Sequence, residues 1–300
     1  MEQEHHKHGK EDWYDKIHLY LLIIPIVFFV FSLVFLGTFQ AKNGDLIYKD
    51  VSLTGGTTIS VFDSKVNIDS VKTEVLKQFP DALIREISNV RTGDQQGFIL
   101  ETKADVKDIQ PALEKILGYK LTQSNSSVEF AGSSLSSGFY KQLRLAVIIA
   151  FLLMAAVVFI IFRTFVPSFT IVLCAFADIV MTLTVVDLLG INVSLAGVIA
   201  FLMLIGYSVD TDILLTTRVI RRDECSINLR VWESFKTGIT MTLTAIAAVG
   251  VSLIVIYNYS DTLRQIFTIL LIGLGFDILN TWVTNASIIK WYAEWKGLHK

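Results

Sequence analysis

The sequence has few charged residues for its length, and this shortage excludes an ordinary water-soluble protein. Asp, Glu, Lys and Arg together make up 18% of the 300 residues, whereas hydrophobic residues make up 52%. A water-facing surface does not tolerate such a composition, so much of the chain must face lipid. The formal net charge of −2 also gives no support to a partner held by bulk electrostatics, such as nucleic acid.

Cysteine and metal-binding clusters are scarce as well. The two cysteines, Cys174 in an apolar run and Cys225 in a basic loop, predict inert thiols on separate segments rather than a disulfide framework. The histidines His5, His6 and His8 have no scaffold of further ligands around them and predict a solvated tail. We therefore expect no metal and no cofactor.

Long apolar runs are abundant, and six of them could cross the roughly 30 Å hydrocarbon core of a membrane. The first, 17–39, follows a polar N-terminal tail, 1–16, and no small-residue cleavage site comes after it, so it predicts a retained anchor. The other five lie within 139–290, at 143–162, 166–189, 193–217, 237–257 and 266–289, and a short tail, 291–300, ends the chain. The runs predict a bundle of six transmembrane helices.

Loop charge predicts the orientation of this bundle. The longest connection between the later spans carries five basic residues: Arg218, Arg221, Arg222, Arg230 and Lys236. Lys and Arg in short loops resist translocation, so this connection should be cytoplasmic. Counting spans from it places both termini inside the cell and residues 40–138 outside. We expect a multi-pass protein of the cytoplasmic membrane, surrounded by membrane lipid.

The polar interval 40–138 predicts an α+β domain. Alternating, strand-like segments and segments of helical spacing follow one another in the order βαββαβ, at 51–62, 68–79, 82–90, 97–104, 105–117 and 119–130. This order is typical of a ferredoxin-like fold. Asp69 and Asp105 are expected to cap helices, and Gly118 to end one. The Gly- and Ser-rich stretch 132–138 predicts a hinge-like linker back to the membrane.

Aspartates inside the apolar runs are the candidate functional residues, because each costs a few kcal/mol to insert into a membrane. The four candidates are Asp178, Asp210, Asp212 and Asp277. Asp187 is set aside, since it falls at the outer end of its span, where water can solvate it. Helical rise places Asp178 and Asp277 at similar depth, with the other two nearer the cytoplasm. The four could share one polar track.

Asp210 and Asp212 are two residues apart, about 200° around a helix, so they must face different partners. One is expected to pair with Arg218 or with a basic residue of another subunit, and the other to be protonated in the interior. Thr and Asn residues accompany the aspartates on their helical faces. Helix packing explains most of them, because such side chains hydrogen-bond across a bundle.

Two aspartates at matched depth are also the chemistry of an intramembrane aspartyl protease, in which one carboxyl group acts as base and the other as acid. The spacing argues against this activity. Residues 273–277, GLGFD, have one residue more than the Gly-x-Gly-Asp signature of such enzymes, and no Tyr precedes Asp178. The residues therefore do not predict an enzyme.

Three stretches together resemble the SecF family of protein-export membrane proteins in its archaeal form, over nearly the whole chain. They are GVIAFLMLIGYSVDTDILLTTRVIRR, the acidic third span CAFADIVMTL, and SLTGGT soon after the first helix. SecF belongs with SecD among the relatives of the RND proton-coupled transporters. The resemblance implies a complex with a SecD-like subunit beside a SecYE-type channel. It also implies that proton-motive force is used to pull or release the translocating polypeptide on the outer side.

The resemblance assigns positions to several residues. Asp178 matches the family's acidic residue of the third span, Arg218 matches the arginine that ends the fourth, and Asp210 falls where SecD-type sequences carry a membrane aspartate. Further family-motif positions are Gly55, Gly56, Gly206, Tyr207 and Ser208. The two domain glycines also fit a close backbone approach or a bulge. Bacterial SecF has Asn-Asp after GYS-x, whereas this chain has Asp-Thr-Asp at 210–212, which leaves open which aspartate carries protons.

Two alternatives stay open beside this interpretation. An RND-type small-molecule or lipid transporter would usually have twice as many spans in one chain, so a chain of this length would need a partner. A purely scaffolding partner of SecD, which leaves proton transfer to SecD itself, is also compatible with the sequence.

Overall fold

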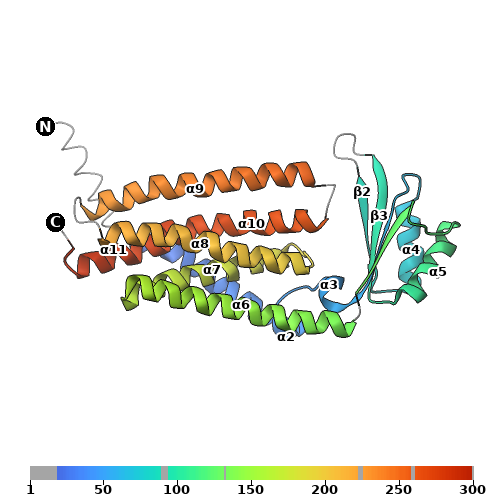
Figure 1. The fold of residues 1–300 in the computed structure, drawn as a ribbon, viewed down its shortest axis with the longest axis horizontal. Coiled ribbons are helices and arrows are strands. Elements are labelled where there is room, and N and C mark those ends of the chain that lie inside the picture. The colour runs from blue at the N-terminus through green and yellow to red at the C-terminus, as the bar shows by residue number, and fades with distance from the viewer. Residues whose placement is uncertain (1–18, 89–93, 132, 222–225, 258–260, 299–300) are drawn as a thin grey trace.

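The computed structural model describes residues 19–88, 94–131, 133–221, 226–257 and 261–298. Within these ranges, six helices are long and apolar enough to cross a membrane: Leu19–Asn43, Gly138–Phe162, Phe165–Leu188, Leu195–Arg221, Ile227–Ile256 and Thr262–Trp295. They lie side by side in an elongated bundle, with an α+β domain beyond one end (Figure 1). The predicted six-helix architecture is confirmed.

Three of the helices form the centre of the bundle. The regular elements are α2 (Ile23–Asn43), α6 (Ser133–Phe162), α7 (Phe165–Leu188), α8 (Leu195–Arg221) and α9 (Ile227–Ile256), followed by a last long helix of α10 (Asp261–Leu279), the π-helical turn η1 (Asn280–Asn285) and α11 (Ala286–Trp295). In the most apolar stretch of α7, 61% of the residues are buried inside the protein, against 6% in the most apolar stretch of α9. Polar side chains on the inward-facing sides of α7, α8 and the last helix are therefore shielded from lipid.

Small residues allow these central helices to pack closely. A methyl group added at Gly273 of α10 would lie 2.4 Å from Cδ2 of Leu204 on α8, and one added at Gly238 of α9 would lie 2.3 Å from Cζ2 of Trp282. Close backbone approach of this kind is the usual basis of helix association in membranes. It fixes the last helix against α8 and α9.

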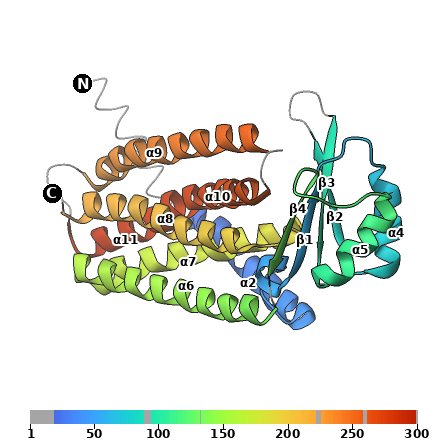
Figure 2. The same ribbon diagram turned by 45° about the vertical axis from the view of Figure 1, so that its right-hand side comes forward.

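The domain has the ferredoxin-like order of elements. Its strands and helices are β1 (Gly56–Val61), α4 (Ile68–Gln78), β2 (Leu83–Ser88), β3 (Gln95–Thr102), α5 (Val106–Leu117) and β4 (Ser126–Ala131). The sheet is antiparallel with the order β2-β3-β1-β4. Both helices cover one face of it (Figure 2), over a core that includes Ile59, Phe98, Leu100, Ile109 and Leu113. The predicted βαββαβ domain is confirmed.

Two of the three helix ends in the domain that the sequence predicted are confirmed. Asp105 accepts a hydrogen bond from the Lys107 amide at 3.1 Å, and Gly118 ends α5 in the left-handed region, as predicted. The predicted cap at Asp69 is wrong. Asn67 caps α4, with extended backbone and a 3.1 Å bond from the Ser70 amide to its side chain. Asp69 already lies within the first helical turn.

The hinge-like linker predicted at 132–138 is wrong over 133–138, because α6 begins at Ser133; residue 132 lies outside the described residues. A serine costs a helix only a few tenths of a kcal/mol, while continuation of α6 adds a backbone hydrogen bond for each residue. The helix therefore extends beyond its apolar span toward the domain.

The strand predicted at 51–62 also begins later than expected. Residues Val51–Thr54 form a short helix, α3, whose first amide donates to the Asp50 carboxylate at 2.5 Å. Gly55 ends α3 with φ 83°, and Gly56 opens β1 with φ 143°. A methyl group at Gly56 would lie 2.2 Å from the Thr102 carbonyl oxygen, which is the close backbone approach that its position suggests.

Candidate functional site

Asp178 lies at the centre of the bundle, where α7 meets α8 and the π-helical turn. Its side chain has no exposed area. One carboxylate oxygen accepts from the Ser208 hydroxyl at 2.5 Å, and the other accepts from the Asn280 amide at 2.7 Å. Asp178 thus joins three segments that are far apart in the sequence.

Asp277 on α10 makes a second polar contact with α8. Its carboxylate lies 3.2 Å from the Thr281 hydroxyl and 3.2 Å from the Thr211 hydroxyl, and its residue is 1% exposed. The Thr211 hydroxyl also lies 2.9 Å from the carbonyl oxygen of Ser208, whose side chain reaches Asp178. Asp178 and Asp277 are consequently linked through adjacent turns of α8.

Asp212 is the third buried carboxyl group of this cluster, with no exposed area. Its Oδ1 accepts from the Asn285 amide at 2.8 Å, whereas Oδ2 has no hydrogen-bond partner in the structure. It lies on the same helix as Ser208 and Thr211, one turn beyond Ser208. We call Asp178, Asp212 and Asp277 the aspartate cluster.

The π-helical turn η1 supplies both side-chain amide donors of the aspartate cluster. Asn280 reaches Asp178 and Asn285 reaches Asp212, while the Ala286 amide donates to the Thr281 carbonyl in the wider pattern of a π-helix. Such turns are frequent at functional sites. Asn285 was missed in the sequence, although the polar run NTWVTN inside an apolar span marks the place.

No basic side chain neutralises the aspartate cluster within the described part of the chain. All the hydrogen bonds that its three carboxyl groups receive come from hydroxyl and amide groups: Ser208, Thr211, Asn280, Thr281 and Asn285. Three buried negative charges without a cation would be very costly in the low-dielectric interior of a bundle. The arrangement therefore suits carboxyl groups that exchange protons better than it suits a permanent ion-pair network.

Two of the predicted site residues, Asp210 and Arg218, do not join the cluster. Asp210 is exposed on the other side of α8, as the 200° separation from Asp212 requires. Arg218 donates to the Glu233 carbonyl at 3.1 Å and to the Thr237 hydroxyl at 2.9 Å, and among the described residues it pairs with neither aspartate of α8. The expectation of one polar track for four aspartates, and of a pair with Arg218, is corrected accordingly.

The remaining motif positions divide between the two sides of α8. Ser208 faces the cluster, whereas Gly206 and Tyr207 lie on the exposed side with Asp210. Asp187, which we expected water to solvate, is only 4% exposed. The segment around Tyr48, which leads into the domain, covers this end of α7.

Nothing in the described residues resembles a metal site. They contain no group of three or more His, Cys, Asp and Glu side chains that could hold a metal ion. Cys174 is buried, with its sulfur 3.7 Å from the Asn280 carbonyl oxygen. The predicted solvated histidines His5, His6 and His8, and the thiol of Cys225, lie outside the described residues.

Comparison with known proteins identifies the family. The model of the C-terminal region of the protein-export membrane proteins SecD and SecF matches residues 113–295, which include the whole aspartate cluster. This chain belongs to the SecD/SecF family. The resemblance seen in the sequence is confirmed, and the chain is a multi-pass membrane protein of protein export.

Archaeal SecF proteins are similar over almost their whole length. The SecF of Methanocaldococcus jannaschii is 39% identical over 278 residues, covering 90% of this chain and 94% of the relative. The SecF of Methanothermobacter thermautotrophicus is 37% identical over 281 residues, covering 91% and 92%. These relatives are named as export proteins, which gives no support to the protease alternative.

A solved structure has the same fold. SecDF, a translocon-associated membrane protein from Thermus thermophilus, superimposes with a TM-score of 0.72 over 94% of this chain at 16% identity. This chain spans 38% of that SecDF chain.

Proposed function

We propose that this chain is an auxiliary subunit of the Sec translocase, which works with a SecD-like subunit to promote polypeptide export. The proton-motive force would act through Asp178, Asp212 and Asp277. The aspartate cluster carries the proposal, because three buried carboxyl groups from three helices meet there on hydroxyl and amide donors only. The SecYE-type channel and the translocating polypeptide are the further partners.

Protonation of Asp178 changes which hydrogen bonds its carboxyl group can form. An ionised Asp178 accepts from both the Ser208 hydroxyl and the Asn280 amide. A protonated carboxyl group has one O–H donor, so the Ser208 hydroxyl must turn to accept it or the helices must shift. One proton that crosses 100 mV supplies about 2.3 kcal/mol, which biases a two-state motion by about fifty-fold. This is enough to drive movement of α8 against α7 and the last helix.

A SecD-like partner is supported by the side of α8 opposite the cluster. Asp210 is exposed there beside Tyr207, and a methyl group added at Gly206 would meet no atom within 4 Å. A carboxyl group that faces lipid within a span is costly, so a polar group of another chain is expected to cover it. We place the SecD-like subunit against this face.

We place the α+β domain outside the cell and the opposite end of the bundle inside. The end of α8 and the start of α9 lie at the end of the bundle remote from the domain (Figure 1), and these helix ends carry Arg218, Arg221 and Arg230. The turn between α7 and α8, which has no Lys or Arg, lies against the segment that leads into the domain. This distribution follows the positive-inside tendency of membrane proteins.

The test replaces each cluster aspartate singly with Asn and measures the export rate of a secreted reporter in cells that also produce the SecD-like chain. Asp178→Asn and Asp277→Asn should lower export severalfold while the chain still co-purifies with its partner. Wild-type export in Asp178→Asn, Asp212→Asn and Asp277→Asn alike would refute proton coupling and would favour the scaffolding role.

Asp210→Leu serves as the matched change on the partner face. It should weaken co-purification with the SecD-like chain, because it removes the polar group that we assign to that contact. Unchanged co-purification would place the partner elsewhere. A chain that purifies without any SecD-like subunit would instead favour the small-molecule or lipid transporter.

A further inference from the structure

The segment that leads into the domain, residues 48–52, forms a short parallel β-bridge with the turn between α7 and α8, which we call the outer turn. Lys49 pairs with Val193, in the turn between α7 and α8. The Val193 amide donates to the Tyr48 carbonyl at 2.6 Å, and the Asp50 amide donates to the Val193 carbonyl at 3.0 Å. Both backbone groups of Val193 are therefore used by the chain segment that enters the domain.

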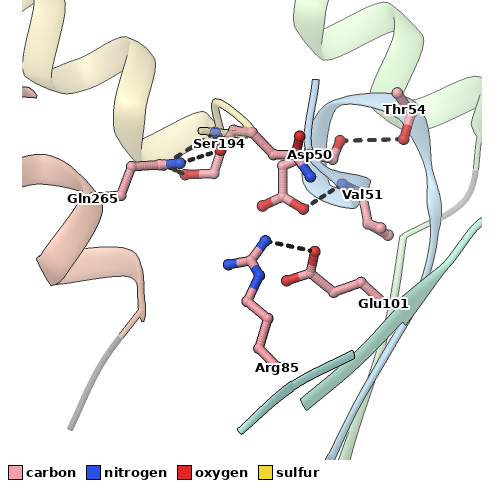
Figure 3. Close-up of polar contacts among 8 residues, drawn as sticks. Asp50, Val51, Thr54, Arg85, Glu101, Ser194 and Gln265 are labelled. Carbon is pink, nitrogen blue, oxygen red and sulfur yellow. Dashed lines mark hydrogen bonds and ion pairs between the residues drawn. The ribbon is translucent and has the colours of Figure 1, made fainter. Parts of the chain in front are cut away.

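The residues on either side of Val193, Asn192 and Ser194, form hydrogen bonds with the side chain of Gln265 on α10. The Ser194 amide donates to the Gln265 side-chain oxygen at 3.1 Å, and the Ser194 hydroxyl donates to the same oxygen (Figure 3). The Gln265 amide in turn donates to the Asn192 carbonyl. The side chain of Gln265 thus pairs with residues 192 and 194 in the manner of a neighbouring strand.

Close packing supports this arrangement. A methyl group added at Gly197, in the first turn of α8, would lie 2.9 Å from the Gln265 oxygen and 2.9 Å from Cγ1 of Val193. The Ser194 hydroxyl also accepts from the Gly197 amide at 3.3 Å, so it caps the start of α8. The turn, α8 and α10 are fixed to one another at this point.

From the same segment the chain enters the domain through the short helix α3. Asp50 caps α3 (Figure 3). The Ser52 hydroxyl accepts from the Leu195 amide at 3.2 Å, and a single residue, Gly55, separates α3 from β1. A continuous path of hydrogen bonds therefore leads from α8 and α10, which carry Asp212 and Asp277, to the segment that enters β1.

We propose that Gln265 is a positioning residue that connects the aspartate cluster with the domain. It holds the outer turn against α10, so that a shift of α10 relative to α8 at the cluster moves the segment 48–52 and with it the domain. The proposal rests on the proposed function, and it adds the residue through which the membrane part acts on the domain.

Gln265→Leu tests this, with Gln142→Leu as the control, because Gln142 is an exposed glutamine on α6. Both are made in the full chain together with the SecD-like subunit in membranes. We expect amide hydrogen exchange of Val193 and Asp50 to rise at least tenfold in Gln265→Leu and export to fall severalfold, with neither change in the control. Unchanged exchange at both amides, or an equal rise in Gln142→Leu, would overturn the proposal.

Gln265→Glu separates positioning from a general effect on folding, and it replaces the leucine variant if that one does not accumulate. A protonated glutamate, like the amide, can donate from one terminal atom and accept at the other, whereas an ionised glutamate has no donor for the Asn192 carbonyl. Acidification of the outer medium should therefore restore amide protection and export in this variant. If the protection of these amides, relative to free amides at the same pH, did not change with pH in this variant, the role of the Asn192 bond would be contradicted.

Failure of the Gln265 proposal can be distinguished from failure of the proposed function. If all three asparagine variants of the aspartate cluster leave export unchanged, proton coupling fails while the exchange measurements on Gln265→Leu still report the connection itself. If Asp277→Asn lowers export and Gln265→Leu does not, the proton site stands and the connection through Gln265 is refuted.

Discussion

Replacement of Asp178 by Asn and by Leu separates its proton chemistry from its role in packing. The carboxylate receives two hydrogen bonds, at 2.5 Å from Ser208 and at 2.7 Å from Asn280. In Asp178→Asn, the new amide oxygen can accept from Asn280, and the new amide hydrogens can face the Ser208 hydroxyl, which accepts as well as donates. At most one hydrogen bond weakens, which within membranes costs about 0.6 to 1.7 kcal/mol.

Asp178→Leu has a larger cost, because it leaves both donors buried without an acceptor. Each unsatisfied group costs about 1 to 3 kcal/mol, so the variant should lose about 2 to 6 kcal/mol of unfolding free energy. Export should fall severalfold in both variants, since neither side chain exchanges a proton in the accessible pH range. The asparagine variant therefore separates export from stability.

The assay is reversible unfolding of the purified chain in bicelles, paired with the export rate in cells. The expected result is a nearly native unfolding free energy with low export for Asp178→Asn, and low values of both for Asp178→Leu. Equal destabilisation by the two substitutions would show that the role of the carboxyl group is structural. Native export by the asparagine variant would refute a role of Asp178 in proton transfer.

Two further predictions concern packing and pH. Gly273→Ala should cost about 1 to 3 kcal/mol of unfolding free energy, because its methyl group would lie 2.4 Å from buried Leu204, whereas Gly275→Ala, with open space around it, should cost nothing. In the domain, burial and the hydrogen bond to Asp63 raise the pKa of Tyr119 from 10.0 to about 12. The folded state thus retains the phenol proton longer than the unfolded state, so stability from this pair is complete below pH 10 and is lost as the pH rises through 12. Urea unfolding of the domain in the full chain checks this, and Tyr119→Phe should remove that pH dependence; an unaltered profile would contradict it.

The spans could be predicted because a membrane imposes one simple requirement, an apolar run of sufficient length. The domain could be predicted because alternation and helical spacing follow from burial on one face, as Ile59, Phe98 and Ile109 show. Local amino-acid composition predicted the helix and strand boundaries less well. The serines at the start of α6 and the residues of α3 adopt helical structure because neighbouring segments continue or cap a helix there.

The candidate site was only partly predictable. Helical spacing requires Asp210 and Asp212 to face opposite sides, but it does not say which side is buried, and the structure buries Asp212. Position along the span misled at Asp187, because the segment around Tyr48 covers a helix end that would otherwise face water. Both outcomes depend on contacts between segments far apart in the chain.

The π-helical turn shows why the remaining contacts could not be read from spacing. Asn280 and Asn285 are five residues apart, about 140° around an ideal α-helix, so one of them would face away from the aspartate that it now reaches. The wider turn, in which the Ala286 amide bonds to the Thr281 carbonyl, presents both amides to the centre of the bundle. The local departure from regular geometry therefore completes the cluster: without it, Asp178 or Asp212 would lack its amide donor, and the polar contacts would connect fewer helices.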